Sequence, residues 1–207
     1  MSFLFWIFLV SIFLLLPVHF FSVNHTALEN RFGKEKGTTL GKILGLISGW
    51  GFFIFLFGLW LSPQPHYHIP LLDVTLFTVP FLNIPIYLIH LFISVPLLLI
   101  SGYLGIVGVI HTSLEVSETH RPKRVETEGI YSQLRHPQYL GAIFAHLAFS
   151  ILFVGFYSLI ATPLIIAYNY LISWKEEKEL IREFSDEYLH YKEMVPMFVP
   201  KFMHPRY

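Results

Sequence analysis

The residues best suited to chemistry stand in the segment 129–141, GIYSQLRHPQYLG, where a polar stretch turns apolar at a His-Pro step. Proline suits the first turn of a helix, because its φ angle is already helical and its missing amide hydrogen would be unpaired there. We therefore predict that a helix begins at Pro137. Its first amides, together with the helix dipole and the neighbouring Arg135 and His136, would form a site for an anionic group.

Two adjacent carboxylates, Glu176 and Glu177, follow the next long apolar block. If residues 139–174 form a tight helical hairpin, these glutamates and the His-Pro step lie at the same end of two packed helices. Amide and cationic groups would then face carboxylates across the hairpin. This arrangement suits a ligand with a carboxylate or phosphate at one end and an ammonium or ribose hydroxyls at the other.

The composition indicates where such a site would lie. The 207 residues are 54% apolar and 14% charged, the mean hydropathy is +0.58, and the apolar residues fall in long blocks. These values predict an integral membrane protein. A formal net charge of zero gives no sign of a nucleic-acid partner. The absence of cysteine excludes disulfides, thiolate metal sites and a cysteine nucleophile.

We predict an all-α integral membrane protein, a single domain over 1–207, with five transmembrane helices and a cytoplasmic amphipathic carboxyl-terminal helix. The last two spans form the hairpin. Apolar residues recur at helical spacing in the tail, which predicts its amphipathic helix. The apolar blocks place the spans at about 3–21, 43–61, 86–110, 139–154 and 157–174.

The basic residues set the expected orientation. With the amino terminus outside, the inside segments are 22–42, 111–138 and 175–207, and these hold all 14 Lys and Arg. Cytoplasmic loops of membrane proteins carry an excess of these residues. We therefore expect the His-Pro step and the carboxyl-terminal tail on the cytoplasmic face.

From about Val125 to Pro200, the pattern GIYxxxRHPxY, hairpin, glutamate pair and EFSDEYLHYKEMVPMFVP resembles a known family. This family is the membrane methyltransferases, which include isoprenylcysteine carboxyl methyltransferase and the phospholipid methyltransferases. The resemblance implies S-adenosyl-L-methionine bound within about residues 111–200, and a lipid-like or small apolar acceptor entering from the bilayer. As cofactor contacts the resemblance implies Lys123, Arg124, Val125, Glu126, Tyr131, His136, Pro137, Gln138, Tyr139 and Glu176. The arrangement of the His-Pro step opposite the glutamate pair adds Arg135 and Glu177 to the predicted contacts.

One position departs from the family pattern. In prenylcysteine methyltransferases an arginine about one helical turn before the first glutamate is linked to the acceptor, whereas this chain has Ile172 there. The departure argues against an isoprenylcysteine carboxylate as the acceptor. Ile172 and Asn169, both in the fifth predicted span, are candidate acceptor contacts. Helix packing is an equal alternative for Asn169.

The acceptor also decides whether a base is needed. Methyl transfer from a sulfonium is an in-line displacement, so alignment and exclusion of water can supply most of the acceleration. A carboxylate acceptor needs no base, but an amine or thiol must lose a proton. The candidate bases are His111, Glu115 and His120, and the sequence does not rank them.

Two other functions stay open. Membrane sterol and steroid reductases, which use NADPH, have a similar carboxyl-terminal pattern. They differ from this chain in having Asn in place of Gln138 and often an acidic residue in place of Ala142. A non-catalytic membrane scaffold of the same fold is the third possibility. His66 and His68 predict a polar loop and no metal site, because a third ligand is missing nearby. The oligomeric state is not indicated.

Overall fold

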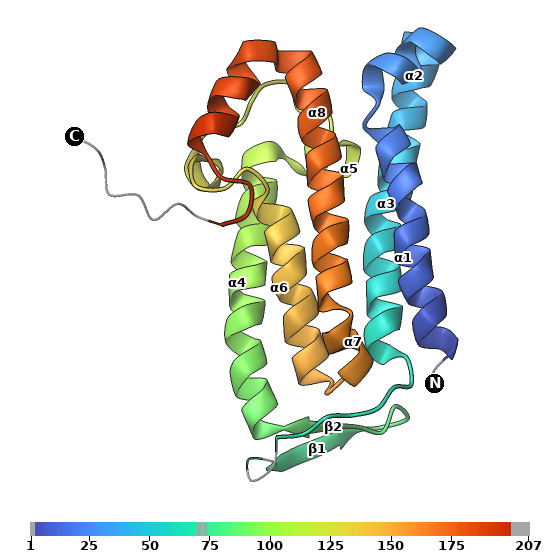
Figure 1. Ribbon diagram of the computed structural model, residues 1–207, viewed down its shortest axis with the longest axis vertical. Coiled ribbons are helices and arrows are strands. Elements are labelled where there is room, and N and C mark those ends of the chain that lie inside the picture. The colour runs from blue at the N-terminus through green and yellow to red at the C-terminus, as the bar shows by residue number, and fades with distance from the viewer. Residues whose placement is uncertain (1–2, 70–71, 73, 200–207) are drawn as a thin grey trace, which may run out of the picture.

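The computed structural model describes residues 3–69, 72 and 74–199. Long helices lie side by side, and a small antiparallel hairpin of strands lies at one end of the bundle (Figure 1). The elements are α1 Phe3–Ser22, α2 His25–Phe32, α3 Lys34–Leu61, β1 Thr75–Val79, β2 Ile84–Tyr87, α4 Leu88–Thr112, α5 Leu114–Thr119, the 3-10 helix η1 Gly129–Ser132, α6 Pro137–Leu152, α7 Phe156–Ile160 and α8 Thr162–Met194.

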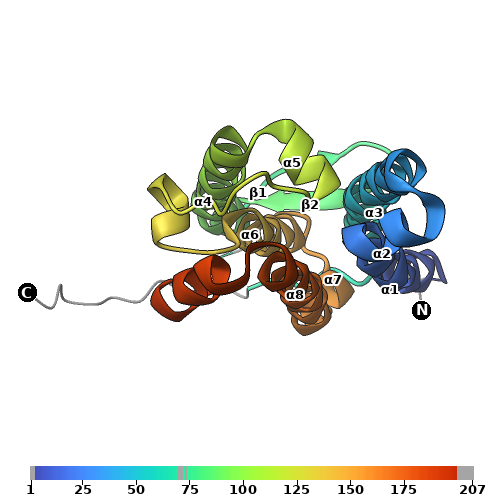
Figure 2. The same ribbon diagram turned by 90° about the horizontal axis from the view of Figure 1, so that it is seen from above.

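Within the described residues, three helices are long and apolar enough to cross a membrane, namely α1, α3 and α4. The shorter apolar helix α6 lies between α4 and α8, and α1 pairs with α3 (Figure 2). The protein is therefore a mostly helical bundle of membrane type. The count of five spans stays a prediction, because α6 and the apolar part of α8 are each shorter than the other three.

The observed boundaries differ from the predicted ones in the connections. The all-α prediction misses β1 and β2, which pair antiparallel with Val79 opposite Ile84 in the proline-rich connection. Helix α3 begins at Lys34, well before the predicted residue 43, because the polar segment ahead of the apolar block is helical too. The last predicted span starts late, at Thr162, because the short helix α7 occupies the turn of the hairpin.

The amphipathic tail belongs to α8, which consists of two helices joined at a kink. Its one non-helical residue is Ser185, with φ 49° and ψ −123°, and beyond this kink the chain turns back along the bundle (Figure 1). The returning segment buries Tyr188 and Tyr191 against Val125 of the linker. The tail thus covers the His-Pro region. Pro200, the end of the predicted cofactor region, lies outside the described residues.

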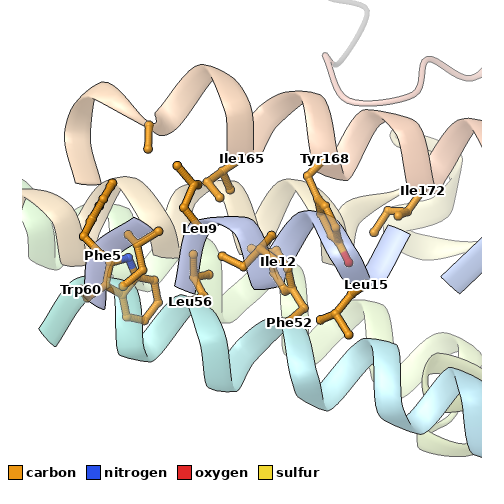
Figure 3. Close-up of a cluster of buried hydrophobic side chains, with 13 residues drawn as sticks. Phe5, Leu9, Ile12, Leu15, Phe52, Leu56, Trp60, Ile165, Tyr168 and Ile172 are labelled. Atoms are coloured by element: carbon orange, nitrogen blue, oxygen red, sulfur yellow. The ribbon is translucent and has the colours of Figure 1, made fainter. Parts of the chain in front are cut away.

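An apolar core joins α1, α3 and α8. Figure 3 shows Tyr168 and Ile172 reaching from α8 toward Leu15 of α1 and Phe52 of α3. The rings of Phe52 and Tyr168 stack, with centroids 4.8 Å apart and planes 8° apart. Buried aromatic pairs of this kind add about 0.5–1.5 kcal/mol beyond their area. This core packs α1 and α3 against the helical hairpin of α6 and α8, and it forms the floor of the candidate functional site.

Candidate functional site

A cavity of about 210 Å³ lies where α1, α3, α5, the linker before η1, α6 and α8 meet. Many of the predicted site residues line it, although they come from distant parts of the sequence. Lys123, Pro137 and Glu177 do not line it. The predicted residues that do are His120, Arg124, Val125, Glu126, Tyr131, Arg135, His136, Gln138, Tyr139, Asn169, Ile172 and Glu176.

The carboxylate of Glu176 is contacted from four sides. Its Oε1 accepts a hydrogen bond from the Tyr139 hydroxyl and lies 3.1 Å from His19 Nε2 and 3.2 Å from His120 Nδ1. Its Oε2 lies 3.8 Å from His136 Nδ1. Burial raises the pKa of Glu176, but His120, His19 and His136 outweigh burial and bring the pKa to about 2. The cavity therefore contains an ionised carboxylate at neutral pH.

Glu177 points to the other side of α8, where it fastens the tail. Its Oε1 accepts a hydrogen bond from Arg135 Nε at 2.7 Å and lies 3.2 Å from His136 Nε2, and its Oε2 lies 2.7 Å from Lys192 Nζ. Burial raises the pKa of Glu177, but the hydrogen bonds from His136, Lys192 and Arg135 lower it to about 2. Arg135 also donates to the carbonyl oxygens of Lys192 and Val195.

Gln138 ties the start of α6 to α4 and α5. Its Nε2 lies 3.0 Å from Ser117 Oγ, 3.3 Å from Thr112 Oγ1 and 3.2 Å from the Tyr131 hydroxyl. The side chain fits because Gly108 faces it, and a Cβ at that position would lie 2.6 Å from Gln138 Cγ. These contacts hold the first turn of α6, with its open amides, at the edge of the cavity.

The structure separates the three candidate bases. Glu115 is exposed and pairs with Lys42 at 2.9 Å, and His111 packs against Gly129, where a Cβ would lie 2.3 Å from its ring. His120 lines the cavity. Burial lowers its pKa to about 4, against the opposing effect of Glu176. At neutral pH His120 is thus a neutral imidazole, and a weak base for a thiol, whose unperturbed pKa is about 8.5.

The two candidate acceptor contacts lie on the apolar side of the cavity. Ile172 is 4% exposed and Asn169 is fully buried. Asn169 Nδ2 donates to the Ile165 carbonyl of its own helix at 2.8 Å. Its Oδ1 has no hydrogen-bond partner within the described part of the chain. A buried acceptor of this kind is costly unless a ligand donates to it.

Sequence reasoning missed the residues that α1 and α3 contribute. His19, Ser48 and Phe52 line the cavity beside the predicted residues. They lie in or near apolar blocks far from the motif region, and only the packing of α1 and α3 against α8 brings them there. The signal that could have found His19 is an ionisable residue near the end of a predicted span, which by default suggests a functional site.

These features define a class: helical membrane proteins with a ligand cavity at one end of the bundle. Residues 86–187 match the model of a family described as phospholipid methyltransferase. This region, just under half of the chain, resembles the isoprenylcysteine carboxyl methyltransferase and phospholipid methyltransferase family of integral membrane methyltransferases.

Two curated relatives agree with this resemblance. The chain is 36% identical over 85 residues to methanethiol S-methyltransferase 1 of Bradyrhizobium diazoefficiens, across 41% of this chain and 29% of that relative. It is 33% identical over 94 residues to protein-S-isoprenylcysteine O-methyltransferase of Xenopus laevis, across 42% of this chain and 29% of that relative. The chain thus spans less than a third of the length of these relatives. No solved structure matches the chain significantly.

Proposed function

We propose that the protein transfers a methyl group from S-adenosyl-L-methionine to an apolar or lipid-anchored acceptor at the cytoplasmic face of a membrane. The observation that carries this proposal is the convergence of the His-Pro step and the glutamate on one cavity. Tyr139 and Glu176 are 37 positions apart, yet their side chains are hydrogen-bonded at the wall of that cavity.

The groups around the cavity fit this cofactor. Glu176 is an acceptor for ammonium, hydroxyl or amine hydrogens, and so is Asn169 Oδ1, which has no hydrogen-bond partner among the described residues; the first amides of α6 are donors for a carboxylate. His136 and Tyr139 would complete the wall around it. When bound, S-adenosyl-L-methionine supplies an electrophilic methyl group on a cationic sulfonium. The protein's own residues would orient the reactants and exclude water, which can provide most of the rate enhancement.

The charges around the cavity favour an acceptor without a carboxylate. Among the described lining residues, the Lys and Arg side chains are Arg124 and Arg135. Arg124 pairs with Glu126 at 3.0 Å and Arg135 with Glu177 at 2.7 Å. A carboxylate acceptor would therefore find no free basic side chain. An uncharged thiol or a lipid-like molecule suits the apolar wall better, and the Bradyrhizobium relative is named for a small thiol, methanethiol.

The proposed orientation rests on the basic segments. The parts of segments 22–42, 111–138 and 175–207 that the structure describes gather at one end of the bundle, while α1 begins at the other end (Figure 1). Because the chain has no cysteine, single cysteines can map the two sides. A membrane-impermeant maleimide added to intact cells should label His66→Cys and spare Glu35→Cys. The reverse pattern would refute the orientation.

Equilibrium binding to purified protein in lipid nanodiscs tests the cofactor. We expect S-adenosylhomocysteine to bind and NADPH not to bind, and binding of NADPH alone would favour the reductase alternative. Glu176→Gln and His136→Ala should each weaken S-adenosylhomocysteine about 10- to 150-fold, which corresponds to losing one charge-assisted contact. Glu115→Gln is the matched control, because this exposed carboxylate pairs with Lys42 and does not line the cavity. Unchanged affinity in both site variants would refute the assignment.

A label-transfer screen tests the acceptor. Radiolabelled S-adenosyl-L-methionine should transfer its methyl group to small thiols or to a component of lipid extracts. Isoprenylcysteine analogues with a free carboxylate are the comparison, and we expect them to be the poorer acceptors because Ile172 replaces the arginine of prenylcysteine methyltransferases. Preferred methylation of these analogues would contradict this argument.

A further inference from the structure

Three potential metal ligands converge beside the proposed cofactor position. His19 comes from the end of α1, His120 follows α5, and Glu176 lies on α8, and one ligand atom from each lies within 4.8 Å of the other two. Glu176 Oε1 is 3.1 Å from His19 Nε2 and 3.2 Å from His120 Nδ1. Two ligands of a tetrahedral ion with bonds of about 2.0–2.1 Å are about 3.3 Å apart, so the spacing fits such an ion.

The hydrogen bonds of His19 show which of its nitrogens is free. The Ser48 hydroxyl donates its single proton to the Gly45 carbonyl at 3.0 Å. The oxygen of Ser48, 3.4 Å from His19 Nδ1, can therefore only accept from that nitrogen. In a neutral His19 this leaves the lone pair on Nε2, which faces the carboxylate. An outer partner that fixes the tautomer in this way is typical of metal-binding histidines.

The buried Nε2 atom of His19 lies 3.1 Å from Glu176 Oε1, and His120 faces the same oxygen through Nδ1 at 3.2 Å. The side chain of His19 is 3% exposed and that of His120 is 10% exposed. Buried polar atoms are seldom left unsatisfied. Two imidazole nitrogens and a carboxylate oxygen that converge on one buried point can share a metal ion between them.

We propose that His19, His120 and Glu176 form a binding site for a divalent transition metal of the zinc class. Imidazole nitrogen and carboxylate oxygen are common zinc ligands, and three protein ligands leave one position for a small ligand. That position would lie in the cavity, since all three residues line it. The site departs from the expectation of no metal, because its ligands are dispersed over the chain and show no ligand spacing.

The metal would also define the acceptor class, an extension that rests on the proposed function. A thiol that coordinates a metal ion is deprotonated: its S–H bond breaks, the proton leaves to water, and the sulfur binds the metal through a lone pair. No protein base is then required. The acceptor would be a thiol, presented as its thiolate beside the methyl donor.

Metal binding by the full-length protein in nanodiscs tests the site. We expect one zinc ion per chain and, after removal with a chelator, one Co²⁺ with the absorption of a tetrahedral site. His19→Ala and His120→Ala should weaken Co²⁺ binding roughly hundredfold or more, and Ser48→Ala about 10- to 100-fold. The double variant His66→Ala, His68→Ala is the matched control. His66 lies in the connection that bridges to Gly155 at the turn of the hairpin, and this variant should bind Co²⁺ normally.

Three further measurements keep the outcomes distinct. Ethanethiol added to the Co²⁺ form without any methyl donor should produce a sulfur-to-cobalt charge-transfer band, and its absence would overturn the thiol assignment. X-ray absorption of the wild-type zinc form should show two imidazole ligands, a result that does not depend on the folding of any variant. If the protein binds S-adenosylhomocysteine but neither zinc nor Co²⁺, the metal site is refuted and the proposed function is not. If the protein binds the metal but not S-adenosylhomocysteine, the metal site stands and the proposed function is refuted.

Discussion

Removing the carboxylate of Glu177 should release the carboxyl-terminal tail and open the cavity. Glu177 is 1% exposed and Arg135 7% exposed, so Glu177→Ala leaves a guanidinium buried without its counter-ion. Such changes cost about 3–5 kcal/mol. Lys192 is 39% exposed and adds only the contribution of a surface pair, about 0–1 kcal/mol. The expected loss is therefore about 3–5 kcal/mol, dominated by Arg135.

The effect should concentrate on the tail. Arg135 and His136 also hold it through their backbone amides, which donate to the carbonyl oxygens of Pro196 and Met197 at 3.0 and 3.3 Å. Limited proteolysis should cut Glu177→Ala after the kink at Ser185 while α1 to α6 stay intact. Affinity for S-adenosylhomocysteine should fall as well, because Tyr188 and Tyr191 of the tail line the cavity.

Two comparisons sharpen the test. Glu187→Ala removes an exposed carboxylate from the part of α8 beyond the kink and should change stability by no more than about 0.5 kcal/mol. In a double-mutant cycle, Arg135→Ala and Glu177→Ala together should cost clearly less than the sum of the two single changes. If Glu177→Ala lost less than about 1 kcal/mol in reversible detergent unfolding and its tail resisted protease, the ion pair would not be what holds the tail.

Two further predictions concern the walls of the cavity. Gly108→Ala should displace Gln138, whose Cγ would lie 2.6 Å from the new Cβ, and weaken S-adenosylhomocysteine severalfold in calorimetry, whereas Gly102→Ala on the same helix meets no atom within 4 Å and should bind normally. Equal affinities of the two variants would contradict the positioning role of Gln138. Asn169→Leu should leave thermal stability unchanged or higher, because it removes an unpaired buried acceptor, while weakening ligand binding about tenfold. A large loss of stability would instead indicate a packing role.

The sequence predicts what depends on local pattern. The start of α6 at Pro137 follows from the conformation of proline, and the long apolar helices follow from blocks of suitable length. The strands β1 and β2 could not be predicted, because their prolines and short length hide any alternation. The position of α7 could not be predicted either, since its residues are as apolar as those of the helices on either side.

The same division holds for the site. A motif shows that Glu176 and Glu177 are adjacent, but successive residues on a helix point in different directions. Only the structure shows that Glu176 faces the cavity while Glu177 faces Arg135 and the tail. Contacts between elements distant in sequence, such as His19 with Glu176, depend on how the helices pack and leave no mark in a local pattern.

The two parts of the cavity wall differ in origin, and this difference bears on specificity. The family match covers 86–187, which includes Glu176, His136 and the first turn of α6, the groups proposed to hold the methyl donor. His19 and Phe52 come from helices outside the match. A donor site shared within a family can serve different acceptors if the remaining wall varies. We therefore expect acceptor choice to depend on α1 and α3 together with Ile172 of α8, and donor binding to depend on the first turn of α6 and on Glu176.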